Sequence, residues 1–247
     1  IELDLPEGVS RSRLDERRNL IQGFGRAKQS ALKLEAEALG RSREMALDML
    51  MNPTVHEAFN LEKEPPALRE KYGMHICGQS VLTARRLTEA GLPVATVYCA
   101  AGDLNGSKGD HFDTHGDNFN KLKNILLPPF DQAASALVED LKERGKLDET
   151  LVVMLTDFGR TPKINGNAGR DHFPGVYSAV FAGGGIQGGQ VYGKSNPTGF
   201  EPADKACGPP DLHATIFHAL GINPEHMIYD TDDRPLPICD GKPLPLF

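Results

Sequence analysis

The chain has 247 residues, a formal net charge of −7 and 39% hydrophobic residues. A chain of this length can bury a sizeable core, and a single α/β domain of this length is ordinary. The acidic balance and the lack of a Lys/Arg block argue against nucleic acid and anionic membranes as partners. No apolar stretch reaches the ~18 residues of a spanning helix, so we expect no membrane insertion.

The four cysteines are scattered and show no C-x-x-C spacing. This pattern argues against a zinc ribbon and against a disulfide framework. The chain begins at Ile1 without a methionine or a secretory apolar region, and a charged helical segment follows directly. We therefore expect that an N-terminal part of the full fold precedes residue 1.

The first third of the chain has the apolar periodicity and the glycine stops of helices. Helices are expected over residues 10–39, 42–51, 54–60, 65–73 and 76–90. We expect residues 1–92 to form a helical N-terminal segment that packs on an α/β core over residues 93–247, within one compact domain.

Apolar, β-branched runs begin at residue 93, and these are typical of buried strands. Strands are expected over residues 93–100, 151–156 and 176–182, with helices over 119–144, interrupted at Pro128-Pro129, and 211–220. This alternation predicts an α/β fold with a mostly parallel sheet and helices on both faces. Ligands of such sheets bind beyond the carboxyl ends of the strands, where loops 101–117 and 157–175 are expected.

Acidic residues and histidines concentrate in these two loops. His111, Asp113 and His115 alternate, so a locally extended loop would place them on one side. Two imidazoles and a carboxylate in that arrangement suit Zn²⁺, Mn²⁺ or Fe²⁺. The alternative is a solvated loop whose Asp and His side chains cap turns.

Three further groups lie in the second loop. Asp157 follows an apolar strand directly, so it is either a metal ligand or the N-cap of the next turn. Asp171-His172 carries the same ambiguity. Arg160 and Arg170 are candidates for holding a phosphate or sulfate group, since a guanidinium binds such oxygens in a fork. Their alternative is an ion pair with a neighbouring aspartate.

The glycines of residues 183–188 match G-x-G-x-x-G after an expected strand. A dinucleotide site needs a helix N-terminus after these glycines, to hold the pyrophosphate. Residues 190–192 have the pattern of a short strand instead. We therefore expect no nucleotide cofactor-binding site, and a hairpin-like turn at these glycines.

Three segments together resemble the motifs of one known family. Phe112–Asn118 is similar to W-D-T-H-x-x-N, Asp157–Asn165 is similar to E-F-G-R-T-P-x-x-N, and Gly169–Pro174 is similar to G-R-D-H-W-P. On these motifs the chain resembles the domain-of-unknown-function 1501 (DUF1501) family, from about residue 45 to its C-terminus. That family is grouped with the alkaline phosphatase and sulfatase superfamily.

The resemblance implies an alkaline-phosphatase-like core with a divalent metal ion (Zn, Mn, Mg or Ca) at the strand ends. The metal ligands that it implies are Asp113, His115 and His172, with Asp171 as a weaker candidate. It also implies a strand before residue 1 that carries the nucleophile.

The catalytic candidates are Arg160, Arg170 and Asp157. In that superfamily, an Asp-His pair just after a strand binds a second metal. This chain has Asp157-Phe158 at that position, so a second metal would lack its histidine. Aromatic Phe112 and Phe173 stand where the family usually has Trp.

The function implied by the resemblance is metal-dependent hydrolysis of phosphate or sulfate esters. The expected partner is a small-molecule or glycan anionic ester, and the location of the family implies a periplasmic or extracellular protein. The alternative is a non-catalytic secreted binding or scaffold protein on the same fold.

Overall fold

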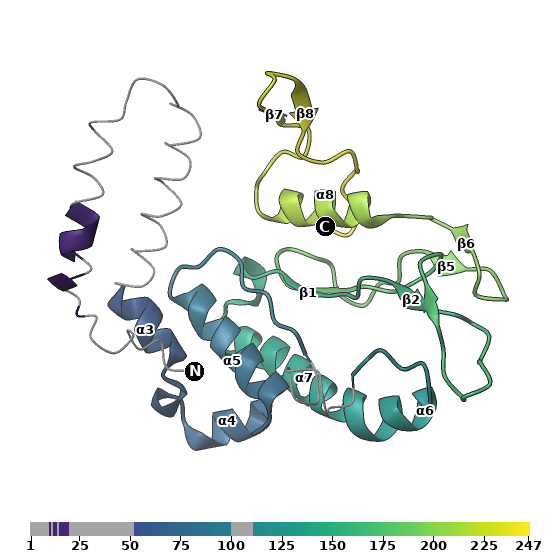
Figure 1. Cartoon of the computed structure of the whole chain (residues 1–247), viewed down its shortest axis with the longest axis horizontal. Coiled ribbons are helices and arrows are strands. Elements are labelled where there is room, and N and C mark those ends of the chain that lie inside the picture. Colours follow the sequence, from purple (N-terminus) through teal and green to yellow (C-terminus); the bar gives the residue numbers. More distant parts are fainter. Residues whose placement is uncertain (1–9, 11, 14, 20–51, 100–110) are drawn as a thin grey trace. The chain divides into compact units, whose positions relative to one another are not determined.

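The computed structural model describes residues 10, 12–13, 15–19, 52–99 and 111–247, drawn as ribbon in Figure 1. Residues 12–13 and 15–19 are helical. The rest of the helix expected over 10–39, and all of the one expected over 42–51, lie outside the described residues. The chain divides into two compact units, residues 1–74 with 79–98, and residues 75–78 with 99–247. No described helix is both long enough and apolar enough to cross a membrane.

The secondary-structure elements described in the first unit are all helical. It contains α3 (Pro53–Phe59), a 3-10 turn η1 (Leu61–Lys63), α4 (Pro66–Tyr72) and most of α5 (Ile76–Glu89). Prolines at the first position of α3 and α4 lack the N–H that would be unsatisfied there. Asn52 caps α3, because its side-chain oxygen accepts from Thr54 N at 2.9 Å. Tyr72 and Leu82 are completely buried in this unit.

A buried ion cluster joins α5 to the segment before α4. Glu64 lies 2.7 Å from Arg85 and 2.5 Å from Arg86. Arg85 also pairs with Glu89, one helical turn away, at 2.5 Å. Burial raises the pKa of Glu64, but the hydrogen bonds from Arg86 and Arg85 outweigh it and hold the pKa below its usual value. The ionised Glu64 carboxylate therefore compensates the positive charges of both Arg85 and Arg86.

The second unit contains the remaining helices. These are α6 (Asn118–Lys121), a π-helical turn η2 (Leu122–Leu126), α7 (Leu127–Glu143), a 3-10 turn η3 (Leu147–Glu149) and α8 (Pro209–Ala219). The helix expected over 119–144 is thus present, and its interruption is a π turn rather than a break. Pro128 and Pro129 have no N–H to offer the preceding turn. Leu127 N donates instead to Leu122 O, five residues back.

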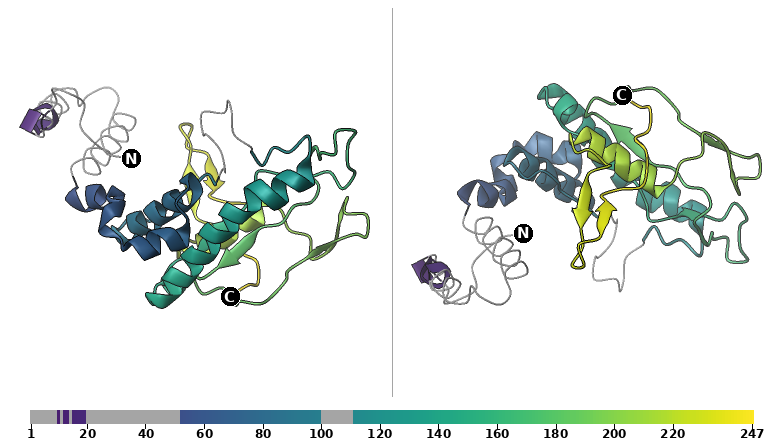
Figure 2. Two further views of the ribbon diagram at one scale, coloured as in Figure 1. Left: turned by 90° about the horizontal axis from the view of Figure 1, so that it is seen from below. Right: turned by 90° about the horizontal axis from the view of Figure 1, so that it is seen from above.

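Within the part of the chain that the structure describes, eight short strands form four pairs. They are β1 (Val152–Met154), β2 (Gly159–Arg160), β3 (His172–Phe173), β4 (Val180–Ala182), β5 (Lys194–Ser195), β6 (Pro202–Asp204), β7 (Met227–Tyr229) and β8 (Pro235–Pro237). The pairs are β1–β4, β2–β3, β5–β6 and β7–β8, and each is antiparallel. Helices α7 and α8 lie on opposite sides of the β1–β4 pair in the views of Figure 1 and Figure 2.

The prediction of a mostly parallel, alkaline-phosphatase-like sheet is wrong. Residues 94–99 include three β-branched side chains but belong to no strand. The other two expected strands are present in part as β1 and β4, and they pair antiparallel, with Val153 opposite Phe181. Parallel neighbours need a crossover connection, usually a helix. Residues 155–179 contain no helix and hold the β2–β3 pair, so the chain returns in the opposite direction.

Candidate metal site

Two segments distant in the sequence form the candidate site in the second unit. One is the loop that leads into α6, and the other is the β2–β3 hairpin, in which Arg160 lies directly opposite His172. Backbone hydrogen bonds hold the hairpin loop against the first segment. Asn118 N donates to Ala168 O at 3.0 Å, and Arg170 N donates to Thr114 O at 3.1 Å. The positions of the functional side chains therefore depend on main-chain contacts between the segments.

Gly169 lies at the closest approach of the two segments. A Cβ atom at this position would be 2.0 Å from His115 O and 2.1 Å from its carbonyl carbon. No side chain fits at such distances, so any substitution of Gly169 has to separate the two segments. The glycine is needed here for space.

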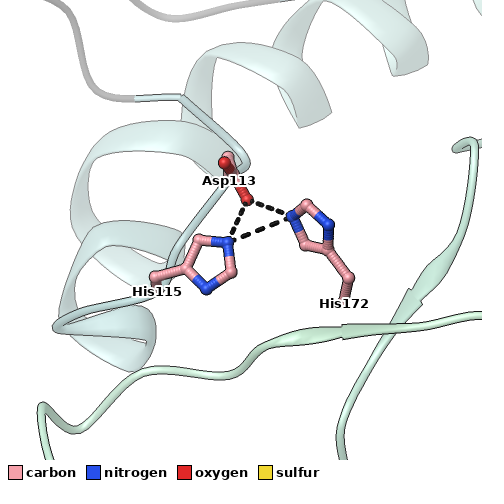
Figure 3. A group of neighbouring side chains, drawn as sticks. All are labelled: Asp113, His115 and His172. Atoms are coloured by element: carbon pink, nitrogen blue, oxygen red, sulfur yellow. Dashed lines mark hydrogen bonds and ion pairs between the residues drawn. The ribbon is translucent and has the colours of Figure 1, made fainter.

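Asp113, His115 and His172 point toward one another from these segments (Figure 3). Asp113 Oδ1 lies 2.8 Å from His172 Nε2 and 3.0 Å from His115 Nε2, and the two Nε2 atoms are 3.1 Å apart. All three side chains are exposed. Three donor atoms of metal-binding type thus converge on one point at the surface of the unit.

The spacing of these atoms fits a divalent ion. With metal–ligand bonds of about 2.1 Å, an ion touching all three atoms would lie about 1.2 Å above their plane. Tetrahedral ligands at that distance are about 3.4 Å apart, so the three atoms need to separate by only a few tenths of an ångström. The open side of the triangle leaves room for a further ligand.

Asp171 orients the His115 ring through a hydrogen bond to its Nδ1 atom. Its Oδ1 lies 2.8 Å from His115 Nδ1. Because a carboxylate only accepts, we assign a proton to Nδ1, which leaves Nε2 as the ring nitrogen that can bind a metal ion. The hydrogen bond from His115, followed by that from Asn165, lowers the pKa of Asp171. Asp171 therefore serves His115 and does not belong to the convergent group, although it was a candidate ligand.

Arg160 is occupied by the first segment. Its Nη2 donates to Asp113 Oδ1 at 2.8 Å and to Phe112 O at 2.9 Å, and its Nη1 donates to Arg170 O at 3.3 Å. The hydrogen bond from His172 and the guanidinium of Arg160 lower the pKa of Asp113 from 3.8 to about 2. Asp113 is therefore ionised at neutral pH and is ready to bind a cation.

Arg170 is placed differently. Its guanidinium lies over the Phe119 ring, 5.2 Å from the centroid, in a cation–π contact. Its buried Nε has no hydrogen-bond partner within the described part of the chain. Unlike the guanidinium of Arg160, that of Arg170 is held by an aromatic ring and, among the described residues, forms no ion pair with a carboxylate.

Two expected residues lie apart from the cluster. Asp157 is exposed, and its Oδ1 accepts from Phe158 N at 3.0 Å. His111, the first residue of the alternating set, is not a member of the convergent group, and His172 provides the second imidazole instead. The Phe158 ring packs on His172, with centroids 4.1 Å apart. Phe158 therefore supports one of the three convergent side chains.

Asn165 is a site residue that was not singled out from the sequence. Its Nδ2 donates to His115 O at 3.0 Å and to Asp171 Oδ1 at 3.1 Å. Its Oδ1 accepts from Asn167 N and from Gly169 N, both at 2.9 Å. The Asn165-Gly166 dipeptide was the available signal, since Asn side chains commonly bond the backbone two residues on.

Comparison with known proteins gives one result. The model of a family described as "Protein of unknown function (DUF1501)" matches residues 1–245 of the chain. No curated protein and no solved structure matches it.

Proposed function

We propose that this chain, which belongs to the DUF1501 family, binds a divalent metal ion and hydrolyses phosphate or sulfate esters. One observation carries the proposal. Asp113 Oδ1, His115 Nε2 and His172 Nε2 come from two segments distant in the sequence and lie 2.8–3.1 Å from one another. Two imidazole nitrogens and one carboxylate oxygen that converge in this way are the ligand set of a divalent metal ion.

The ligand types narrow the choice of ion. Two imidazoles and one carboxylate suit Zn²⁺ or Mn²⁺, whereas Ca²⁺ and Mg²⁺ take mainly oxygen ligands. When bound, such an ion polarises an ester oxygen and lowers the pKa of water. The expected metals are therefore Zn²⁺ first and Mn²⁺ second.

The protein's own residues take two further roles in this proposal. Arg170 holds the anionic group of the ester, because its guanidinium forms no ion pair with a carboxylate among the described residues and lies over the Phe119 ring. Arg160 positions Asp113, because its guanidinium is already engaged by that carboxylate and by two carbonyl groups. The earlier expectation that both arginines hold the anion is thus reduced to one of them.

A second candidate function is a non-catalytic, metal-dependent binding protein. The observation that favours it concerns the nucleophile. Within the described residues, no Ser, Thr or Cys side chain is hydrogen-bonded to the three ligand side chains. Binding of an anion without turnover would then be the activity of the site.

The test is metal binding followed by turnover. Zn²⁺ and Mn²⁺ are titrated into the metal-free protein by calorimetry, and the bound metal is counted by elemental analysis. We expect one ion per chain. His172→Ala should weaken binding at least about 100-fold, since it removes one of three ligands. His213→Ala is the matched control, because His213 is an exposed histidine on α8.

The loaded protein is then assayed with a panel of phosphate and sulfate esters. Turnover that His172→Ala abolishes and His213→Ala preserves supports the hydrolase. One bound ion without turnover supports the binding protein. Failure to bind either metal, or equal affinity of the wild type and His172→Ala, refutes both.

A further inference from the structure

An apolar groove lies on the helix that follows the first ligand-bearing segment. Its walls are Phe119 of α6, Leu122 of the π turn, and Leu127, Pro128 and Phe130 of α7. The groove is open and has a volume of about 820 Å³, within the usual range of small-ligand sites. Its form follows from the two prolines, since the π turn that they cause widens the helix at this point.

Both ligand-bearing segments reach this groove. Phe112, the neighbour of Asp113, packs edge-on against Phe130, with ring centroids 6.2 Å apart. Arg170, two residues before His172, lies over Phe119. The groove is therefore adjacent to both segments that carry the ligands of the candidate metal site.

The walls of the groove are exposed although they are apolar. Phe119 is 50% exposed and Leu127 is 43% exposed. About half of each of these apolar side chains is in contact with water, and a ligand that covers them would gain the free energy of burying that area. Several such side chains gathered beside a cluster of charged groups are typical of a ligand site.

We propose that this groove binds an aromatic ring carried by the substrate, so that the substrates of the site are aryl esters of phosphate or sulfate. The proposal rests on the proposed function. Two phenylalanines and a proline offer flat surfaces, and aromatic rings pack on them in offset or edge-on geometry. Arg170 lies at the edge of the groove, over Phe119, where the anionic group of such an ester meets its ring. Lys123 and Asp131 are the charged groups along the groove.

The experiment compares two non-hydrolysable anions on the metal-loaded protein by calorimetry. These are phenylphosphonate and methylphosphonate, which share the anionic group and differ in the ring. We expect phenylphosphonate to bind at least about 10-fold more tightly, from the apolar area that the ring buries. Leu127→Ala should reduce this ratio about threefold or more and leave the affinity for methylphosphonate unchanged. Tyr229→Ala is the control, since Tyr229 is an exposed aromatic residue on β7, outside the groove.

Equal affinities for the two phosphonates, or a ratio that Tyr229→Ala lowers as much as Leu127→Ala does, would overturn the proposal. Sedimentation of both variants provides a second measurement. A dimer of the wild type that Leu127→Ala dissociates would assign the groove to a second copy of the chain, and would also overturn it.

A neutral fluorescent aromatic probe, N-phenyl-1-naphthylamine, separates this proposal from the metal site. We expect it to bind the metal-free wild type and His172→Ala equally, and to bind Leu127→Ala and Phe119→Ala more weakly. If no metal binds, the proposed function fails and the probe alone decides whether the groove takes a ring. Binding that is absent, or unchanged in both groove variants, refutes the groove.

Discussion

Replacing Asn165 by alanine should loosen the metal site without removing a ligand. The side chain of Asn165 makes four hydrogen bonds, to His115 O, Asp171 Oδ1, Asn167 N and Gly169 N, at 2.9–3.1 Å. The first two fix the backbone of one ligand and the carboxylate that orients it. The other two shape the loop that carries Gly169 and Asp171.

The size of the effect follows from these bonds. A partly exposed hydrogen bond contributes about 0.5–1.5 kcal/mol net, so the two bonds that act on His115 and Asp171 together contribute about 1–3 kcal/mol. That free energy corresponds to roughly a 10–100-fold loss of metal affinity, the range typical of groups that orient metal ligands. Asn165→Asp should lose at least as much. It keeps the acceptor oxygen but replaces the donor to Asp171 with a second negative charge.

The assay is calorimetric titration of Zn²⁺ into the wild type and both variants at pH 7.5. Asn196→Ala is the matched control. Its side-chain oxygen accepts from Thr198 Oγ1 and Phe200 N in another loop, so it tests the general cost of removing such an asparagine. Zn²⁺ affinity of Asn165→Ala within about twofold of the wild type would refute the reasoning. In that case the backbone contacts alone position His115.

Two further predictions concern ionised side chains. Glu64→Gln should destabilise the chain by about 3 kcal/mol in denaturant unfolding, because it removes the charged carboxylate that pairs with the buried Arg85 and with Arg86. The exposed Glu62→Gln is the control, and a loss below about 1 kcal/mol would contradict the role of the cluster. For Asp113, folding lowers the pKa from 3.8 to about 2, so the unfolded chain takes up the proton first. Its contribution is complete above about pH 5 and is lost as the pH falls toward about 2. The difference in unfolding free energy between the wild type and Asp113→Asn should therefore become smaller between pH 5 and pH 3, measured on metal-free protein at constant salt. A difference that stays constant or grows would show that the ion pairs and hydrogen bonds of Asp113 are screened by solvent.

The helices were the part of the fold that the sequence predicted well. Those expected over 54–60 and 76–90 correspond to α3 and α5 within one residue at each end. Caps, prolines and glycine stops act within one or two turns, so a local pattern contains the information. The sheet depends on which segments pair. Apolar runs at 151–156 and 176–182 predict strands. Whether these strands pair parallel or antiparallel depends on whether the connection between them is a crossover, and the runs themselves do not show this.

The candidate site was predicted more closely than the sheet that was expected to carry it. Motifs placed Asp113, His115 and His172 in one group, and the structure brings their ligand atoms together. Nothing in the local pattern distinguished His111 from His172 as the second imidazole, because that choice depends on how the β2–β3 hairpin folds back. The function of Asn165 depends on the same long-range contact, since one of its bonds is to a residue 50 positions earlier.

The two histidines of the cluster are not equivalent, and the difference shows which contact prepares the site. His115 has its Nδ1 proton fixed by Asp171, so its Nε2 already faces the cluster as an acceptor. His172 contacts Asp113 Oδ1 through Nε2 at 2.8 Å, and that carboxylate can only accept. His172 therefore has to move its proton to Nδ1, or lose it, before Nε2 can bind a cation. An ion that binds His172 Nε2 therefore has to replace the hydrogen bond from His172 to Asp113. Arg160 weakens that competition, because its guanidinium continues to neutralise Asp113 after the proton leaves.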